Sequence, residues 1–189
     1  MRIGVISDTH MPPFDDLVCS SVEAAFAGVE LILHAGDLVT LSVLDWLERT
    51  APVVAARGNN DSYLPADARL ADVQMLDLNG SRVGMTHVLP ARRVPDPPPV
   101  PELARQCGLD PAPDVWVFGD SHRDVVEWRD GVLLVNPGSP TSPHLRVDFP
   151  GTVAILTLGG GRPEAELVHL PAPGHPGSRA LRSPTAEVL

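Results

Sequence analysis

The sequence has little cysteine and no long apolar run, and each shortage argues against a class of protein. Cys19 and Cys107 form no C-x-x-C pair, so neither a disulfide framework nor a thiolate zinc site is indicated. No segment approaches the roughly 20 apolar residues that cross a bilayer, so we expect no membrane interface. Met1 leads directly into the apolar segment 3–6, which leaves no room for a signal peptide. We therefore expect a cytoplasmic protein.

Basic residues are also in the minority. The chain has 14 Lys+Arg against 24 Asp+Glu, a formal net charge of −10. Such a surface repels nucleic-acid backbones, so we expect no extended nucleic-acid interface. Carboxylates that bind divalent cations are counted at full charge while their metals are not counted, so the charge does not exclude a phosphate-bearing substrate.

Short β-branched segments alternate with helical patterns in the first third of the chain. A helix is expected over 15–28, opened by Pro12-Pro13, and a second over 41–49. Helices placed between strands in this way predict parallel strands with right-handed crossovers. The predicted strands cover 2–7, 30–34, 53–57, 114–118, 132–135 and 152–158.

Two hairpins change the pattern in the second half. Segments 73–78 and 82–87 flank Asn79-Gly80, and segments 125–128 and 132–135 flank Asp130-Gly131. Parallel strands with antiparallel additions suggest two packed sheets with helices outside.

Proline divides the remainder of the chain. A proline-rich loop over 89–101 leads into a short helix over 101–107. The 189 residues fit one domain, which we expect over 1–170, followed by an extended Pro/Gly/Ala-rich tail over 171–189.

Polar side chains gather where the first three predicted strands end. These ends carry Asp8-Thr9-His10, Gly36-Asp37 and Gly58-Asn59-Asn60-Asp61. The carboxyl ends of neighbouring parallel strands open into one crevice, so the three clusters should converge. Asp8 and His10 can reach one ion, while the two oxygens of Asp37 can bridge two ions roughly 3.5 to 4 Å apart. Asn59 adds a neutral oxygen donor.

Two later strand ends add further ligand types. One carries His87 after Gly84-Met85-Thr86, and the other reads Gly119-Asp120-Ser121-His122. A mixture of imidazole, carboxylate and carboxamide suits Mn²⁺, Fe²⁺, Zn²⁺, Ni²⁺ or Co²⁺ better than Ca²⁺ or Mg²⁺ alone.

Taken in order, these clusters resemble the calcineurin-like metallophosphoesterase superfamily, in particular its small bacterial and archaeal phosphodiesterases related to the phosphoesterase-like subunit of retromer. The resemblance covers residues 1 to about 158. Each motif is weak alone, but the ordered set is specific. It reads Asp8-Thr9-His10, Gly36-Asp37, Gly58-Asn59, His87, Gly119-Asp120-Ser121-His122 and Asn136-Pro137-Gly138-Ser139.

The resemblance implies a four-layer α/β/β/α sandwich of two mixed sheets with a dinuclear metal site. Mn²⁺ is the leading candidate for both ions, with Fe, Zn, Ni, Co or Mg as alternatives. A hydroxide between the ions would attack phosphorus, with Asp37, Asn59 and His87 acting most directly in catalysis. The first ion would be held by Asp8, His10, Asp37 and His122, and the second by Asp37, Asn59, His87 and Asp120.

Two positions depart from the family pattern. Asp120 stands where the family usually has His, which adds negative charge to the second site and favours harder ions. Asn60 stands where many phosphomonoesterases carry a candidate general acid, and a carboxamide cannot donate a proton as an acid. Asn60 and the neighbouring Arg57 are candidates for substrate contacts, although Arg57 fits a structural ion pair equally well.

The sequence therefore predicts a metal-dependent phosphodiesterase that acts on a small phosphodiester. Two alternatives stay open, a weakly catalytic or non-catalytic interaction scaffold of the same fold and a phosphomonoesterase. A homo-oligomer is compatible with the sequence. We expect His34 to lie behind the ligands, Trp46 and Trp116 in the core, and Trp128 on a hairpin.

Overall fold

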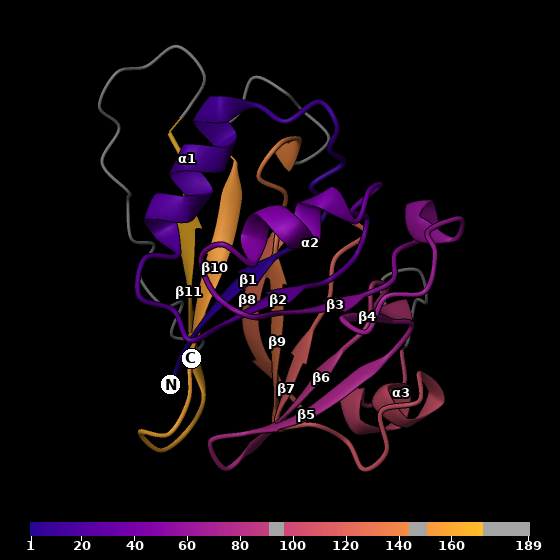
Figure 1. Ribbon diagram of the computed structural model, residues 1–189. Coiled ribbons are helices and arrows are strands. Elements are labelled where there is room, and N and C mark those ends of the chain that lie inside the picture. Colours follow the sequence, from indigo (N-terminus) through magenta and orange to yellow (C-terminus); the bar gives the residue numbers. More distant parts are fainter. Residues whose placement is uncertain (91–96, 144–150, 172–189) are drawn as a thin grey trace.

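The computed structural model describes residues 1–90, 97–143 and 151–171, and it contains two mixed sheets (Figure 1). In the larger sheet the strand order is β11-β10-β1-β2-β3-β4. β1 to β4 are parallel, as the βαβ pattern predicted, whereas β10 and β11 are antiparallel to their neighbours. The strands are β1 (Arg2–Ile6), β2 (Leu31–His34), β3 (Val53–Ala56), β4 (Leu70–Ala71), β10 (Thr152–Thr157) and β11 (Glu164–His169).

The second sheet contains both predicted hairpins. Asn79-Gly80 joins β5 to β6, and Asp130-Gly131 joins β8 to β9. All four turn residues have positive φ, as two-residue hairpin turns of type I′ require. The strand order is β5-β6-β7-β9-β8, with β5 (Gln74–Leu78), β6 (Ser81–Met85), β7 (Val115–Val117), β8 (Asp124–Arg129) and β9 (Val132–Pro137).

Three apolar clusters separate four layers. The first, with Phe26 and Trp46, packs α1 (Asp16–Ala25) and α2 (Ser42–Leu47) on the larger sheet. The second lies between the two sheets, and the third packs α3 (Val100–Gln106) on the second sheet around Trp116. The four-layer sandwich and both core tryptophans are confirmed, and Trp128 lies on β8 of the second hairpin. Within the described ranges, no helix is both long and apolar enough to span a bilayer.

Several local predictions differ from the structure. Pro12-Pro13 does not open the first helix, because the carboxylate of Asp15 caps it by accepting from the backbone of Leu17 at 2.9 Å and of Val18 at 3.0 Å. β4 and β11 were not predicted, since both are edge strands defined by pairing with β3 and β10. Parts of two predictions, 91–96 of the proline-rich loop and 172–189 of the tail, lie outside the described residues.

Candidate metal centre

The predicted ligands lie on loops that follow β1, β2, β3, β6 and β7, where the carboxyl ends of both sheets meet. Backbone hydrogen bonds tie these loops together. Asp8 donates to the Gly36 carbonyl at 2.9 Å, and Gly119 donates to the His87 carbonyl at 2.8 Å. The convergence expected from parallel strand ends is therefore observed, and it includes both sheets.

The predicted ligands share an unusual backbone conformation. Five of them are non-glycine residues with positive φ, a region that costs roughly 1–2 kcal/mol per residue for L-amino acids. Such conformations persist only where the surroundings determine them, and they cluster at functional sites. The φ values are 54° for Asp8, 46° for His10, 59° for Asp37, 67° for Asp120 and 55° for His122.

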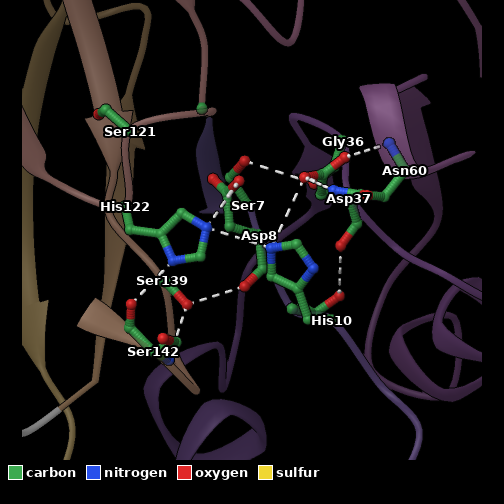
Figure 2. A network of polar contacts seen from close by, with 12 residues as sticks. Ser7, Asp8, His10, Gly36, Asp37, Asn60, Ser121, His122, Ser139 and Ser142 are labelled. Carbon is green, nitrogen blue, oxygen red and sulfur yellow. Dashed lines mark hydrogen bonds and ion pairs between the residues drawn. The ribbon is translucent and has the colours of Figure 1, made fainter. Parts of the chain in front are cut away.

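The first group of ligands comprises Asp8, His10 and His122, whose donor atoms lie within 4.8 Å of one another. Figure 2 shows Asp8 beside the imidazoles of His122 and His10, whose rings are stacked. Nδ1 of His122 lies 2.8 Å from the Ser142 carbonyl, which can only accept, so Nδ1 carries the hydrogen. In the neutral ring, Nε2 of His122 then presents a lone pair to the site, 3.1 Å from Nε2 of His10.

The second group comprises Asp8, Asp37 and His87, also within 4.8 Å of one another. Nδ1 of His87 lies 2.7 Å from the Ala35 carbonyl, which fixes the hydrogen on that nitrogen. Nε2 of His87 faces two acceptors, Oδ1 of Asn59 at 3.1 Å and Oδ1 of Asp37 at 3.5 Å. The other oxygen of Asp37, Oδ2, lies 3.6 Å from Nε2 of His10. Asp8 thus belongs to both groups, and Asp37, a member of the second, has one oxygen near His87 and the other near His10 of the first.

Charge in the site is not balanced by the protein alone. Among the described residues, neither oxygen of Asp8 has a hydrogen-bond partner, although the side chain is fully buried, and burial raises its pKa to about 6. Burial lowers the pKa of His87, but the carboxylates of Asp37 and Asp8 outweigh it and raise that pKa to about 9. Burial raises the pKa of Asp37, yet hydrogen bonds from His87 and Asn60 keep it well below its usual range. The proton on Nε2 of His87 faces the oxygens of Asn59 and Asp37, so a positive charge is favoured at this position and a metal cation could take its place.

These donors fit divalent metal ions. Two buried carboxylates, three imidazoles and one carboxamide oxygen converge, and two of the imidazoles are oriented through Nδ1 by backbone carbonyls, as metal-binding histidines usually are. The unpartnered oxygens of Asp8 lack the hydrogen bonds that a buried carboxylate needs unless a cation is bound.

Asp120 stands apart from the other predicted ligands. It is half-buried and has the same left-handed backbone as Asp8, but within the described residues neither group includes it.

Two predicted substrate contacts are engaged within the protein. The backbone and side-chain amides of Asn60 donate to the two oxygens of Asp37, at 2.9 and 2.6 Å. The guanidinium of Arg57 donates to the Asp61 carbonyl at 2.7 Å and the Leu64 carbonyl at 3.3 Å, and lies 3.4 Å from Asp72. Arg57 therefore braces the loop after β3.

Two glycines allow the loops to approach closely. A Cβ at Gly58 would lie 2.2 Å from both the backbone nitrogen and Oδ1 of Asp37. A Cβ at Gly119 would lie 2.0 Å from Oγ of Ser7 and 2.7 Å from Oδ2 of Asp8. The glycines of the Gly-Asn and Gly-Asp-Ser-His motifs thus make room for the carboxylates of neighbouring strands.

Asp61 is a supporting residue that the sequence did not assign. Its fully buried carboxylate accepts from the backbone nitrogens of Asp37, Val39 and Gly58, each at 2.8 Å. It therefore joins the loop after β2 to the loop after β3. Its place in Gly58-Asn59-Asn60-Asp61 was visible, but a carboxylate that binds backbone amides has no signature of its own in the sequence.

His34 and the Asn-Pro-Gly-Ser motif also support the ligands. His34 is fully buried, accepts from the backbone of Gly36 through Nδ1 at 3.1 Å, and lies 3.2 Å from Oγ1 of Thr9. Burial lowers its pKa to about 3, so it stays neutral behind the site, as expected. Oγ of Ser139 donates to the Asp8 carbonyl at 2.8 Å, and Asn136 donates to the Gly119 carbonyl at 2.8 Å.

A two-sheet sandwich with carboxylates and imidazoles converging at its strand ends defines a class of metal-dependent hydrolases. The sequence profile of the calcineurin-like phosphoesterase superfamily domain matches residues 1–161. The chain belongs to this superfamily, and its relatives support a metal-dependent phosphoesterase.

Curated relatives and solved structures agree with this assignment. A probable metallophosphoesterase of Methanothermobacter thermautotrophicus is 35% identical over 175 residues, which cover 92% of this chain and 95% of the relative. A phosphodiesterase of Methanocaldococcus jannaschii is 30% identical over 73% of this chain and 83% of its own. Vacuolar protein sorting 29 of Cryptosporidium parvum superimposes with a TM-score of 0.75 at 19% identity, over 96% of both chains, and therefore has the same fold.

Proposed function

We propose that this protein is a phosphodiesterase that uses two divalent ions, preferably Mn²⁺, to hydrolyse a small phosphodiester. One observation carries the proposal. The two oxygens of Asp37 face Nε2 of two histidines from different groups, His10 at 3.6 Å and His87 at 3.5 Å. A carboxylate in that position is suited to join two ions.

The chain's own residues set out the roles around these ions. Bound divalent ions would supply Lewis-acid activation of water and of the phosphoryl oxygens. Asp8, His10 and His122 would hold one ion, while His87 and Asn59 would hold the other, with Asp37 shared between them. The role of Asp120 in the second site remains a prediction from the family pattern.

The choice of a diester rests on Asn60. Its carboxamide and backbone amide hold Asp37 and have no acidic proton to give to a departing oxygen. A reaction without a general acid at this position favours leaving groups that need little protonation. The similarity to a phosphodiesterase of Methanocaldococcus jannaschii supports the same substrate class.

A second candidate is an interaction scaffold of the same fold with weak or no catalysis. The observation in its favour is Asp120, which lies outside both ligand groups in the described chain. The similarity in fold to vacuolar protein sorting 29 is compatible with that reading.

Hydrolysis assays separate these functions. Protein stripped of metal with a chelator is tested on bis(p-nitrophenyl) phosphate and on p-nitrophenyl phosphate, with and without Mn²⁺. We expect metal-dependent hydrolysis that is faster for the diester. A faster monoester reaction would favour a phosphomonoesterase, and binding of metal without turnover of either substrate would favour the scaffold. Full activity in metal-free protein would contradict the mechanism.

A further inference from the structure

An exposed aromatic ring stands on the loop that carries Asn59 and Asn60. Tyr63 is 66% exposed, the highest value among the large hydrophobic residues exposed in the described chain. It follows the short 3₁₀ helix Asn59–Asp61 by two residues. An exposed tyrosine on a loop is ordinarily mobile, since nothing fixes its side chain.

This tyrosine is held in place. Its phenolic oxygen donates to the Val39 carbonyl at 2.7 Å, across to the loop after β2. Arg57 binds the carbonyls of Asp61 and Leu64, on either side of Tyr63 in the chain. The hydroxyl and the backbone thus fix the ring, while the residue as a whole stays 66% exposed.

The anchor lies next to the shared carboxylate. Val39 follows Asp37 by two residues and has a φ of 71°, a strained conformation for a β-branched residue. Its backbone nitrogen donates to Asp61 and its carbonyl accepts from Tyr63, at 2.8 and 2.7 Å. Because two trans peptide units span at most about 7 Å, the anchoring point of the ring is close to Asp37.

An aromatic surface that is already immobilised binds a ligand with little further loss of side-chain entropy. Val88, which directly follows the candidate ligand His87 in the chain, is another exposed apolar residue. Ligand sites commonly combine a few polar groups with apolar and aromatic walls.

We propose that the ring of Tyr63 forms a subsite for an aromatic group attached to the phosphorus of the substrate. The inference rests on the proposed phosphodiesterase function and specifies its substrate class, esters of aromatic or base-bearing alcohols. The hydroxyl of Tyr63 positions the turn at Val39, whereas its ring contacts the organic group. Substitutions can separate these two roles.

Two phosphonates that are not hydrolysed test the subsite directly. Methylphosphonate and phenylphosphonate are titrated by calorimetry into the full-length protein loaded with Mn²⁺. The measured quantity is the ratio of the two dissociation constants. A substitution that alters the metal site affects both phosphonates equally and leaves this ratio unchanged. Aromatic pairs contribute about 0.5–1.5 kcal/mol beyond area burial, which corresponds to about two- to twelvefold in this ratio.

We expect Tyr63→Ser to lose about two- to twelvefold of the preference for phenylphosphonate. Tyr63→Phe keeps the ring but loses the hydroxyl that anchors it, so its preference should fall between those of the wild type and Tyr63→Ser. Trp128→Ser is the matched control, because Trp128 is also an exposed aromatic residue. It lies on β8, whose extended backbone places Trp128 roughly 15 Å from His122. An unchanged ratio in Tyr63→Ser would overturn this inference alone, whereas failure of the loaded wild type to bind either phosphonate would overturn the proposed function with it.

Discussion

The carboxylate of Asp61 should contribute more to stability than any exposed acidic residue. In Asp61→Asn, the amide oxygen can replace Oδ2, which accepts from Asp37 and Gly58, but the amide nitrogen then faces the backbone nitrogen of Val39. The partly buried N–H of Val39 is left unsatisfied, at about 1–3 kcal/mol, and the two remaining hydrogen bonds lose the strength that a charged acceptor gives. We therefore expect the free energy of unfolding to fall by about 2–4 kcal/mol, a large share of the roughly 5–15 kcal/mol by which a typical domain is stable.

Urea denaturation of metal-free protein measures this loss. Asp77→Asn is the matched control, because Asp77 is exposed on β5, and it should change stability by less than about 0.5 kcal/mol. Both variants should be compared with the wild type in the same buffer, and the comparison holds only if all three proteins show the same slope of unfolding free energy against urea concentration. A change below about 0.5 kcal/mol in Asp61→Asn would refute the inference that this carboxylate binds the two loops together.

The remaining predictions concern the ligand groups. Gly58→Ala should destabilise the fold and lower metal content, because the new Cβ meets Asp37 at 2.2 Å; thermal unfolding and metal analysis check it, and a wild-type melting temperature contradicts it. The pKa of His87 is about 9, and its Nε2 must lose a proton before it can bind a metal. The metal affinity of the site should therefore rise about tenfold per pH unit up to about pH 9. A constant affinity between pH 7 and 8.5, measured by calorimetry, would contradict this. Asp120→Ala should weaken the second ion more than the ion at His122, and unchanged calorimetric titrations would show that Asp120 is not a ligand.

The fold could be predicted because its signals are local. Asn79-Gly80 and Asp130-Gly131 adopt the positive φ that hairpin turns require, and the helical spacing between the first strands gave a parallel arrangement. The start of α1 was predicted to within one residue, but the signal was misassigned, because the Asp15 cap and not Pro12-Pro13 determines the boundary.

The convergence of the candidate ligands could be predicted from the order of their motifs along the chain, but their environment could not. Asp8 and His122 are 114 residues apart in the sequence, and folding brings Oδ1 of Asp8 to 3.5 Å from Nε2 of His122. The roles of Asp61 and Tyr63 depend on backbone atoms of the loop after β2, which carry no residue-specific signal. The sequence identified Asn60 as a position where many relatives have a candidate general acid. Its hydrogen bond to the carboxylate of Asp37 is evident only in the structure.

The central claim, that Asp37 joins two metal ions for phosphodiester hydrolysis, is tested most directly by counting metals in Asp37→Asn. Metal-stripped wild type and variant are saturated with Mn²⁺, freed of excess metal, analysed by atomic emission, and assayed with bis(p-nitrophenyl) phosphate. We predict two ions per chain in the wild type, at most one in the variant, and a fall in hydrolysis larger than the roughly 10- to 100-fold typical of residues that only support a ligand. Two bound ions and near-normal hydrolysis in Asp37→Asn would contradict the claim.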